Sequence, residues 1–346
     1  MPRTQTQAAP TPTTVAIIVS MVLCIAALPF LVRPPNFDGI FGPIEKPVED
    51  LLPEERFLVN FGDSFSETGL SLNWTYHRVG YEISKVNRTS RPSVPGPRPE
   101  NPIGSPEWPG KTSTGGNNWL TYLTADYNTT LTLTYNFARS GSVIDKKNIK
   151  PNPHNTTTFV DQVVHFNDSI GHRPVYAAWT AENAIGTIWL GTTDVTEAAK
   201  SKYGVELLTV SNRRMFDLIL ELYEIGLRRF IVMDVPPINL MPGLRPGRLG
   251  ERDYEKLNRA IKTWNDLLRE NLHSFQMDYP ESKISLVETS RIFYYAYLHP
   301  KKFGSRDSSC DDDDGFSCLW KDKFHPGKKI HQLIGRKVAE EAWDYE

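Results

Sequence analysis

Short apolar runs alternate with helical patterns along most of this chain, and this alternation limits the folds that it can adopt. The first run, 57–61, has the length and composition of a buried strand. Four later runs are similar: 132–136, 187–191, 229–235 and 284–287. Between them, apolar residues recur at helical spacing in 205–225 and 254–275. Strands that alternate with helices predict a parallel sheet covered on both faces and joined by right-handed crossovers.

The first apolar run ends abruptly at Gly62-Asp63-Ser64. Such a break is typical of the point where a strand meets a helix. We therefore expect Ser64 to open a helix at the carboxyl edge of the sheet. Ligands bind at this edge in open α/β folds, and a free backbone N–H there can hold an anion. From these residues alone, Ser64 is either a nucleophile or a serine that only caps the helix.

A nucleophilic serine needs a base and a carboxylate that orients the base, and the chain offers one such pair near its end. Asp322 precedes His325 by three residues, so its carboxylate can reach the imidazole within one turn. Pro326 is expected to start the final helix. A second His-Pro pair, His299-Pro300, has alanine at position 296 and lacks an orienting carboxylate. We interpret His299 as a surface or structural histidine.

Four short blocks follow one another along the chain. They are Gly62-Asp63-Ser64, Asn136-Phe-Ala-Arg-Ser-Gly141, Gly191-Thr-Thr-Asp194 and Asp322-x-x-His325. Their order and spacing resemble the GDSL, or SGNH, hydrolases. Residues 110–119 and 229–238 narrow the match, and the chain from Arg56 onward is similar to the fungal acetylesterases of carbohydrate esterase family sixteen. The resemblance implies a three-layer α/β/α sandwich with a five-stranded parallel, flavodoxin-like sheet.

The resemblance also implies a serine esterase that removes acetyl groups from carbohydrates through an acyl-enzyme, without a metal or an organic cofactor. Ser64 would attack the ester carbonyl, His325 would act as general base and then acid, and Asp322 would orient the imidazole. The N–H groups of Ser64 and Gly141 would stabilise the oxyanion. Family members generally place an asparagine as the third donor, where this chain has Thr193. A threonine hydroxyl donates one hydrogen bond but is shorter.

Composition divides the chain into four segments. Residues 1–14 are polar and rich in Thr, Gln and Pro, and we expect them to be disordered. Residues 15–32 contain no charge over 18 positions, which is long enough to span a membrane. We interpret them as a signal anchor, with a cleaved signal peptide as the alternative. Residues 33–53 are a proline-rich linker, and residues 54–346 form the esterase domain.

Glycosylation sequons and cysteines point to the secretory pathway. Five asparagines are predicted acceptors of N-linked glycans: Asn73, Asn87, Asn128, Asn155 and Asn167. Cys310 and Cys318 are the pair outside the apolar segment, and an oxidising compartment would let them form a disulfide. The esterase domain is therefore expected on the lumenal or extracellular side, attached to a membrane if residues 15–32 are retained.

Charge gives no reason to expect a nucleic-acid partner, since the formal net charge of the 346 residues is −2. The acidic run Asp311–Asp314 does not fit a calcium-binding EF-hand loop. The first ligand position would fall on Cys310 and the twelfth on Lys321. We interpret the run as a solvated loop tip.

The sequence is also compatible with two other functions. One is a lipase or phospholipase of the same superfamily, which the apolar segment supports weakly by placing the site near lipid. The other is a catalytically weak surface glycoprotein that binds carbohydrate, because of Thr193. Four loop aromatics have rings suited to stacking on sugars, but loop packing is the commoner role and we leave them out of the site: Trp74, Tyr76, Trp108 and Trp119.

Overall fold

The computed structural model describes residues 55–71, 96–154 and 156–343. The strands are β1 (Glu55–Gly62), β2 (Leu131–Asn136), β3 (Ala184–Trp189), β4 (Arg229–Met233) and β5 (Lys283–Val287). The α-helices are α2 (Trp119–Ala125), α3 (Phe159–Phe166), α4 (Thr192–Lys200), α5 (Gly204–Ile225), α6 (Glu251–Asp278), α7 (Thr289–Leu298) and α8 (Lys328–Ala342). Short 3-10 or π segments are η4 (Asn167–Gly171), η5 (Val175–Ala177), η6 (Ile238–Leu240) and η7 (Pro300–Phe303).

The five strands pair in parallel in the order β2-β1-β3-β4-β5. This confirms the five-stranded parallel sheet of flavodoxin-like order. The chain first places β2 on one side of β1 and then β3 on the other, so the order reverses next to β1. Open α/β sheets bind ligands at the carboxyl ends of the strands beside such a reversal. The sheet therefore places the end of β1 where a site is expected.

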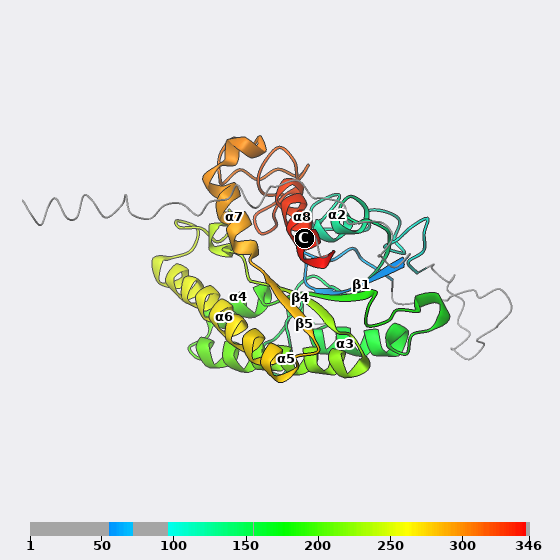
Figure 1. The fold of residues 1–346 in the computed structure, drawn as a ribbon. Coiled ribbons are helices and arrows are strands. Elements are labelled where there is room, and N and C mark those ends of the chain that lie inside the picture. Colours follow the sequence, from blue (N-terminus) through cyan, green and yellow to red (C-terminus); the bar gives the residue numbers. More distant parts are fainter. Residues whose placement is uncertain (1–54, 72–95, 155, 344–346) are drawn as a thin grey trace, which may run out of the picture. The chain divides into compact units, whose positions relative to one another are not determined.

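Helices cover both faces of the sheet, which confirms the three-layer architecture (Figure 1). Helices α2, α7 and α8 lie on one face, and α3, α4, α5 and α6 lie on the other (Figure 1). The longest helix, α6, turns the predicted apolar stripe inward, with Leu257, Trp264 and Leu268 buried. Because β1 is buried along nearly its whole length, both helical layers press on the strand that precedes Ser64.

The segment after β1 differs from the helix that we expected. The N–H groups of Ser66 and Glu67 donate to the carbonyl of Asp63 at 3.1 and 3.0 Å, which closes a single turn. The Asp63 carboxylate accepts the N–H of Phe65 at 3.0 Å, and residues 67–71 are irregular. The prediction of a helix at Ser64 was wrong because side-chain hydrogen bonds to the backbone compete with a helix here.

Several predicted boundaries also shift: β4 ends at Met233 rather than at 235, and α6 extends beyond 254–275 at both ends. Two further shifts have a clear cause. Strand β3 ends at Trp189, because Gly191 adopts a φ of 112° and caps α4. A Cβ at Gly191 would lie 2.3 Å from the indole of Trp264, so both conformation and space require glycine. Helix α8 begins at Lys328, two residues after Pro326, because Gly327 is its N-cap and donates its N–H to the carbonyl of Leu319 at 2.7 Å.

Several sequence predictions lie outside the described residues. They are the tail 1–14, the apolar segment 15–32, the linker 33–53, the sequon residues Asn73, Asn87 and Asn155, and the aromatics Trp74 and Tyr76. Within the part that the structure describes, no helix has the length and apolar character needed to cross a bilayer.

The two remaining loop aromatics behave differently from each other. Trp108 is 37% exposed. The expectation that Trp119 is an exposed loop aromatic was wrong, because this residue starts α2 and is fully buried. Its Nε1–H donates to Ser66 Oγ at 3.1 Å, so Trp119 packs beneath the turn that bears Ser64.

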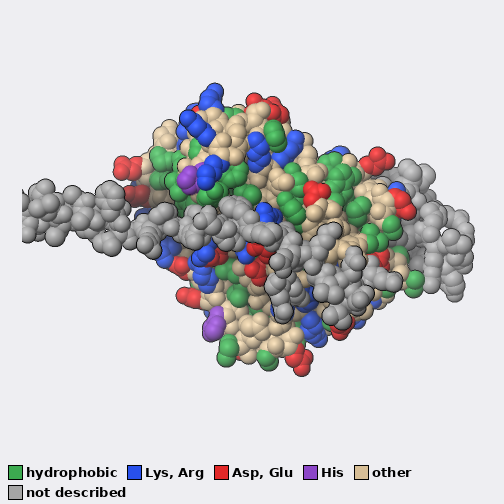
Figure 2. Space-filling view, turned by 45° about the horizontal axis from the view of Figure 1, so that its top comes forward, with side chains coloured by type: hydrophobic (Ala, Val, Ile, Leu, Met, Phe, Trp, Pro, Cys, Tyr) green, Lys and Arg blue, Asp and Glu red, His purple; other side chains and the backbone are tan. Residues whose placement is uncertain are grey.

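Charged side chains of both signs occur on the face of the molecule that Figure 2 shows. This mixture agrees with the formal net charge of −2. Where described side chains are visible in this view, lysine and arginine are interspersed with aspartate and glutamate.

Candidate active site

Ser64 lies directly beyond β1, at the carboxyl edge of the sheet. Strands β2 and β3 pair with β1 on its two sides, so the backbone that leads to Ser64 is fixed. The carbonyl of Ser64 accepts a hydrogen bond from Ser113 Oγ. Its Oγ lies 3.0 Å from Nε2 of His325, a residue 261 positions away. The fold thus brings the two residues that sequence reasoning had paired into hydrogen-bonding contact.

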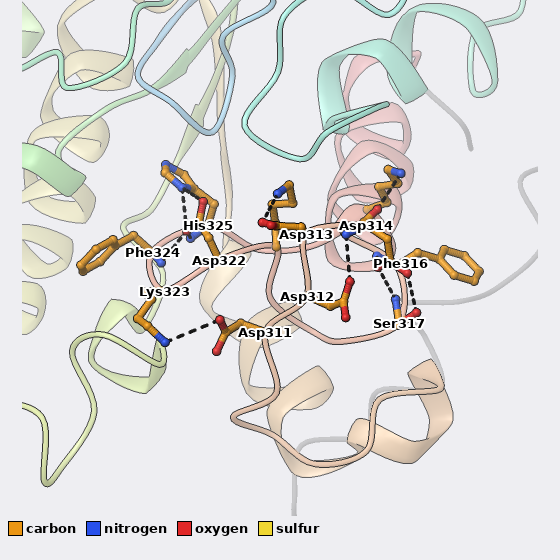
Figure 3. Close-up of polar contacts among 12 residues, drawn as sticks. Asp311, Asp312, Asp313, Asp314, Phe316, Ser317, Asp322, Lys323, Phe324 and His325 are labelled. Carbon is orange, nitrogen blue, oxygen red and sulfur yellow. Dashed lines mark hydrogen bonds and ion pairs between the residues drawn. The ribbon is translucent and has the colours of Figure 1, made fainter.

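Asp322 and His325 form a compact local turn before α8 (Figure 3). Asp322 Oδ1 accepts the N–H groups of Phe324 and His325 at 2.8 and 2.9 Å. Asp322 Oδ2 lies 2.8 Å from His325 Nδ1. The opposite ring nitrogen faces Ser64, and Phe65 packs edge-on against the imidazole with 6.1 Å between ring centroids. The carboxylate therefore fixes the ring so that Nε2 can accept the serine proton.

The electrostatics of Asp322 favour its ionised form. Partial burial alone would raise the pKa of its carboxyl, but hydrogen bonds from the His325 ring and the Phe324 N–H outweigh burial and lower the pKa. Asp322 keeps 41% of its side chain exposed, against 24% for His325. The pair is thus a charged acceptor at the surface with a more enclosed imidazole behind it.

Two backbone N–H groups predicted as oxyanion donors belong to Ser64 and Gly141. Among the described residues, neither N–H has a hydrogen-bond acceptor. The segment before Gly141 is attached to β1, since Arg139 N–H donates to the Gly62 carbonyl at 3.2 Å. Gly141 has a φ of 76°, and an added Cβ would lie 1.6 Å from the carbonyl oxygen of Asn152. Only glycine fits this position.

Thr193, the predicted third donor, is the second residue of α4 and is half-buried. Its hydroxyl has no hydrogen-bond partner in the described part of the chain. The next residue, Asp194, is fully buried, and both of its carboxylate oxygens lie 3.3 Å from the N–H of Ile144. This contact joins the segment 191–194 to the loop that follows Gly141.

Gln162 is a residue that sequence reasoning missed. Its Oε1 accepts the N–H of Gly62, and its Nε2 donates to the carbonyl of Gly62, each at 2.9 Å. Nε2 also lies 3.0 Å from Ser142 Oγ. One fully buried side chain from α3 thus connects the residue two before Ser64 with the residue after Gly141. No local pattern indicates this link, because the partners are separated by 100 positions.

Asp63 and Asp194 place two buried carboxyls next to the candidate site. Burial raises the pKa of Asp63 to about 6, although the Phe65 N–H acts in the opposite direction. Burial raises the pKa of Asp194 to about 7, and the charge of Asp63 adds to the effect. In the sequence, Asp63 and Asp194 belong to two of the four short blocks. Nothing in those blocks predicted that the two carboxyls would be buried close to each other.

Cys310 and Cys318 form a disulfide, as predicted, with 5.2 Å between their Cα atoms. The bond closes the loop that contains Asp311–Asp314. The carboxylates of these aspartates contact residues of the same loop and of the segment that follows it (Figure 3). Asp313 pairs with Lys321 at 2.8 Å, and Asp311 lies 3.6 Å from Lys323, beside Asp322. Across the described residues, no group of three or more metal-binding side chains is arranged to hold a metal ion.

Two predicted glycosylation sites fall within the described residues. Asn167 is exposed at the end of α3. Asn128 is half-buried, and its Nδ2 donates to the carbonyl of Thr130 at 2.9 Å. Attachment of a glycan to Asn128 therefore requires this side chain to leave its local contact, whereas Asn167 is directly accessible.

A serine hydrogen-bonded to an imidazole that a carboxylate orients is the arrangement of serine hydrolases. The family model of the GDSL-like lipases and acylhydrolases matches residues 58–338. An acetylesterase of Thermothelomyces thermophilus is 32% identical over 298 residues, which cover 86% of this chain and 91% of that protein. An acetylesterase of Hypocrea jecorina is 21% identical over 351 aligned positions, covering 88% and 93%.

Among solved structures, the chain is similar to an acetylxylan esterase from Geobacillus stearothermophilus. It has a TM-score of 0.45 and 14% sequence identity, and the match covers 83% of this chain and 93% of that one.

The chain belongs to the GDSL family of lipases and acylhydrolases. Within that family it is a carboxylic ester hydrolase of the acetylesterase type.

Proposed function

We propose that this esterase removes acetyl groups from carbohydrates, with Ser64, His325 and Asp322 as its catalytic residues. The observation that supports these roles most directly is the pair of contacts made by His325. Its Nε2 lies 3.0 Å from Ser64 Oγ and its Nδ1 lies 2.8 Å from Asp322 Oδ2. Two acetylesterases aligned over most of this chain support the acetyl group as the acyl part.

In the acylation step, Ser64 Oγ bonds to the acetyl carbonyl carbon while its proton passes to His325 Nε2. The imidazolium that results is stabilised by Asp322, whose lowered pKa keeps it ionised. Collapse of the tetrahedral intermediate breaks the bond to the sugar oxygen, which takes the proton from Nε2. In the second half, His325 accepts a proton from water, the hydroxide attacks the acetyl-serine, and acetate leaves as Ser64 regains its proton.

The oxyanion of each tetrahedral intermediate needs donors that are already in place. The N–H groups of Ser64 and Gly141 suit this role because neither has an acceptor among the described residues. Thr193 is proposed as a weaker third donor through its hydroxyl. Loss of one donor typically costs about 10² to 10³ in turnover, so Thr193→Asn is expected to raise kcat if the amide reaches the oxyanion. An unchanged kcat would assign the oxyanion hole to the backbone.

The test is hydrolysis of acetate esters by the full chain beside its Ser64→Ala variant. We expect 4-nitrophenyl acetate and acetylated oligosaccharides to be hydrolysed by the parent protein and not by the variant. Rates should fall steeply from acetate to butyrate and octanoate, because an acetyl pocket rejects longer chains. Preference for octanoate would favour the lipase alternative. Equal silence of two folded proteins would favour a protein that only binds carbohydrate.

We also propose that the esterase domain faces the secretory lumen or the cell exterior. The Cys310–Cys318 disulfide and the exposed Asn167 support this location. Expression in a eukaryotic host should give a protein whose mobility increases after endoglycosidase treatment. Asn167→Gln should remove part of that shift, and a protein without any glycan would contradict the proposal.

A further inference from the structure

The two N–H groups that suit the oxyanion lie in two separate turns. Ser64 belongs to the first turn, after β1, which the Glu67 N–H closes by donating to the Asp63 carbonyl at 3.0 Å. Gly141 belongs to a second turn, residues 139–142, after β2. Because the two turns follow different strands, contacts between them set the distance between the two donors.

The second turn has a conformation that decides where the Gly141 N–H points. The Ser142 N–H donates to the Arg139 carbonyl at 3.2 Å, and Gly141, at the third position, has a φ of 76°. Ser140, at the second position, has a negative φ, so the turn is of type II. Type I and type II turns differ mainly by a rotation of the peptide between their second and third residues. That peptide carries the Gly141 N–H.

Glu67 joins the two turns through its side chain. Its Oε2 accepts the Ser140 N–H at 2.9 Å, and the Ser140 hydroxyl donates to the same oxygen. The Glu67 backbone is itself fixed, because its carbonyl accepts a hydrogen bond from Asn118 Nδ2 at 3.1 Å. A carboxylate that starts from the Ser64 turn therefore holds the residue next to Gly141.

The second turn is held at its two ends by different side chains. At one end, Ser142 Oγ lies 3.0 Å from Nε2 of Gln162, and both side chains are fully buried. At the other end, Ser140 is exposed and Glu67 is half-buried. Since water competes for an exposed N–H, this end of the turn is the one that loosens when the carboxylate is removed.

The negative charge of Glu67 has a cation close to it. Burial lowers the pKa of the Arg139 guanidinium, and the charge of Glu67 acts in the opposite direction. The guanidinium donates to the carbonyl of Ala138 at 2.8 Å and to that of Leu70. A cation fixed in this way offsets a carboxylate charge that would otherwise repel an oxyanion, so the contribution of Glu67 is its hydrogen bonds.

We propose that Glu67 is a positioning residue of the oxyanion hole, which keeps the Gly141 N–H directed at the reacting oxygen by holding Ser140. The inference rests on the proposed ester hydrolysis at Ser64 and adds a residue outside the four sequence blocks. Glu67 acts through the Ser140–Gly141 peptide and does not touch the substrate. Because the oxyanion forms only in the intermediate, loss of Glu67 lowers kcat and leaves KM nearly unchanged.

The kinetic test uses 4-nitrophenyl acetate and variants of the full chain. Glu67→Ala should lower kcat about 10- to 100-fold, less than the loss of a whole donor, because the N–H remains but is no longer directed. Glu67→Gln should stay within about threefold of the parent, since its Oε1 still accepts the Ser140 N–H. The matched control is Glu340→Ala: Glu340 is also half-buried, pairs with Lys337 at 2.9 Å on α8, and should leave kcat unchanged.

Ser140→Ala extends the test to an exposed position, where the fold tolerates substitution. It removes the hydroxyl bond and keeps the N–H bond, so kcat should fall about threefold in the parent and not further in Glu67→Ala. A parent-like kcat of Glu67→Ala, or a Glu67→Gln variant as slow as Glu67→Ala, overturns the inference. If urea unfolding shows that Glu67→Ala does not fold, a parent-like kcat of Ser140→Ala overturns it instead.

An amide spectrum separates this inference from the proposed function. With ¹⁵N-glycine labelling, the Gly141 N–H should give one sharp signal in the parent and in Glu340→Ala. In Glu67→Ala the signal should shift and broaden, because the peptide is free to adopt both orientations. If the parent hydrolyses no ester, the proposed function fails, while this signal still reports whether Glu67 holds the turn. An unchanged Gly141 signal in Glu67→Ala overturns the inference.

Discussion

The two halves of the candidate site are held by different kinds of contact. Ser64 and Gly141 follow buried strands, and Gln162 links the two segments by bonding to the Gly62 backbone and to the Ser142 hydroxyl. Asp322 and His325 hold each other through a turn of four residues, inside a region that a disulfide and exposed ion pairs support. One half is thus part of the core, whereas the other is a more exposed turn whose two residues bond mainly to each other.

Mutations in the two halves are therefore expected to have different effects on stability. Damage to the buried half leaves several polar groups without partners in a medium that solvates them poorly, so the penalty is large. Damage to the loop half exposes groups that water can satisfy, so the fold survives while the geometry of His325 loosens. The proposed catalysis requires both halves, but stability should depend mainly on the first.

The largest effect is expected from the loop half itself. His325→Ala removes the proposed base and should lower kcat on the order of 10⁴-fold or more, with nearly unchanged stability. The measurement is steady-state hydrolysis of 4-nitrophenyl acetate together with a urea unfolding curve. His299→Ala is the control, because His299 is exposed and contacts Tyr295, with 4.9 Å between ring centroids. Equal losses in both variants would contradict the assignment.

A smaller but more general loss is expected from Gln162→Leu. It leaves the buried Gly62 N–H without its acceptor and leaves the Gly62 carbonyl with the Arg139 N–H alone, which should destabilise the fold by about 3 kcal/mol. Because Gly62 precedes Ser64 by two residues, kcat should fall as well. Urea unfolding and ester hydrolysis measure the two effects.

Val164→Ala is the control for this prediction, since Val164 is 50% exposed on the same helix. Wild-type stability of Gln162→Leu would show that the buried half does not depend on the long-range link.

Buried and exposed carboxyls offer a pH test of the same comparison. Burial raises the pKa of Asp234 to about 6, against hydrogen bonds from Ser290 and Thr289. Because the folded state then holds the proton more tightly than the unfolded state, this stabilisation is complete below about pH 4 and is lost as the pH rises through about 6. The pKa of Asp322 is lowered instead, so its contribution to stability is lost as the pH falls rather than as it rises.

Asp234→Asn removes this titration while keeping an acceptor for Thr289, which Asp234 contacts at 2.7 Å. Between pH 4 and pH 7 the parent should therefore lose about 3 kcal/mol of unfolding free energy relative to the variant. Urea unfolding at a series of pH values measures the difference. Parallel pH profiles would mean that Asp234 titrates normally in the folded protein.

The smallest effect is expected from opening the disulfide loop with Cys310→Ser and Cys318→Ser together. Loss of this short cross-link should cost about 2 kcal/mol. Hydrogen exchange should quicken at the Lys321 N–H, which donates to the His325 carbonyl at 2.9 Å. The Phe137 N–H, which donates to the Asn60 carbonyl at 2.8 Å, is the control in the core. Equal acceleration at both amides would mean that the two halves are not independent.

Sequence reasoning identified the parts of the site whose chemistry is local. The three-residue spacing of Asp322 and His325 is enough to predict their contact, because one turn of backbone brings the side chains together. Gly141 was predicted through the resemblance to the GDSL hydrolases, and its φ of 76° is a conformation that favours glycine. The helix after β1 was a wrong prediction, because the competing hydrogen bond of Asp63 cannot be read from propensity.

The sequence by itself determined the sheet, since the strand and helix periods reflect the burial of each residue, and it determined which side chains can transfer a proton. Only the tertiary structure decided that Ser64 meets His325 across 261 positions, that Gln162 joins two blocks, and that Glu67 meets Ser140. Periodicity reports how a residue faces the core, but it does not report which distant residue it meets there. That choice depends on packing summed over the whole domain.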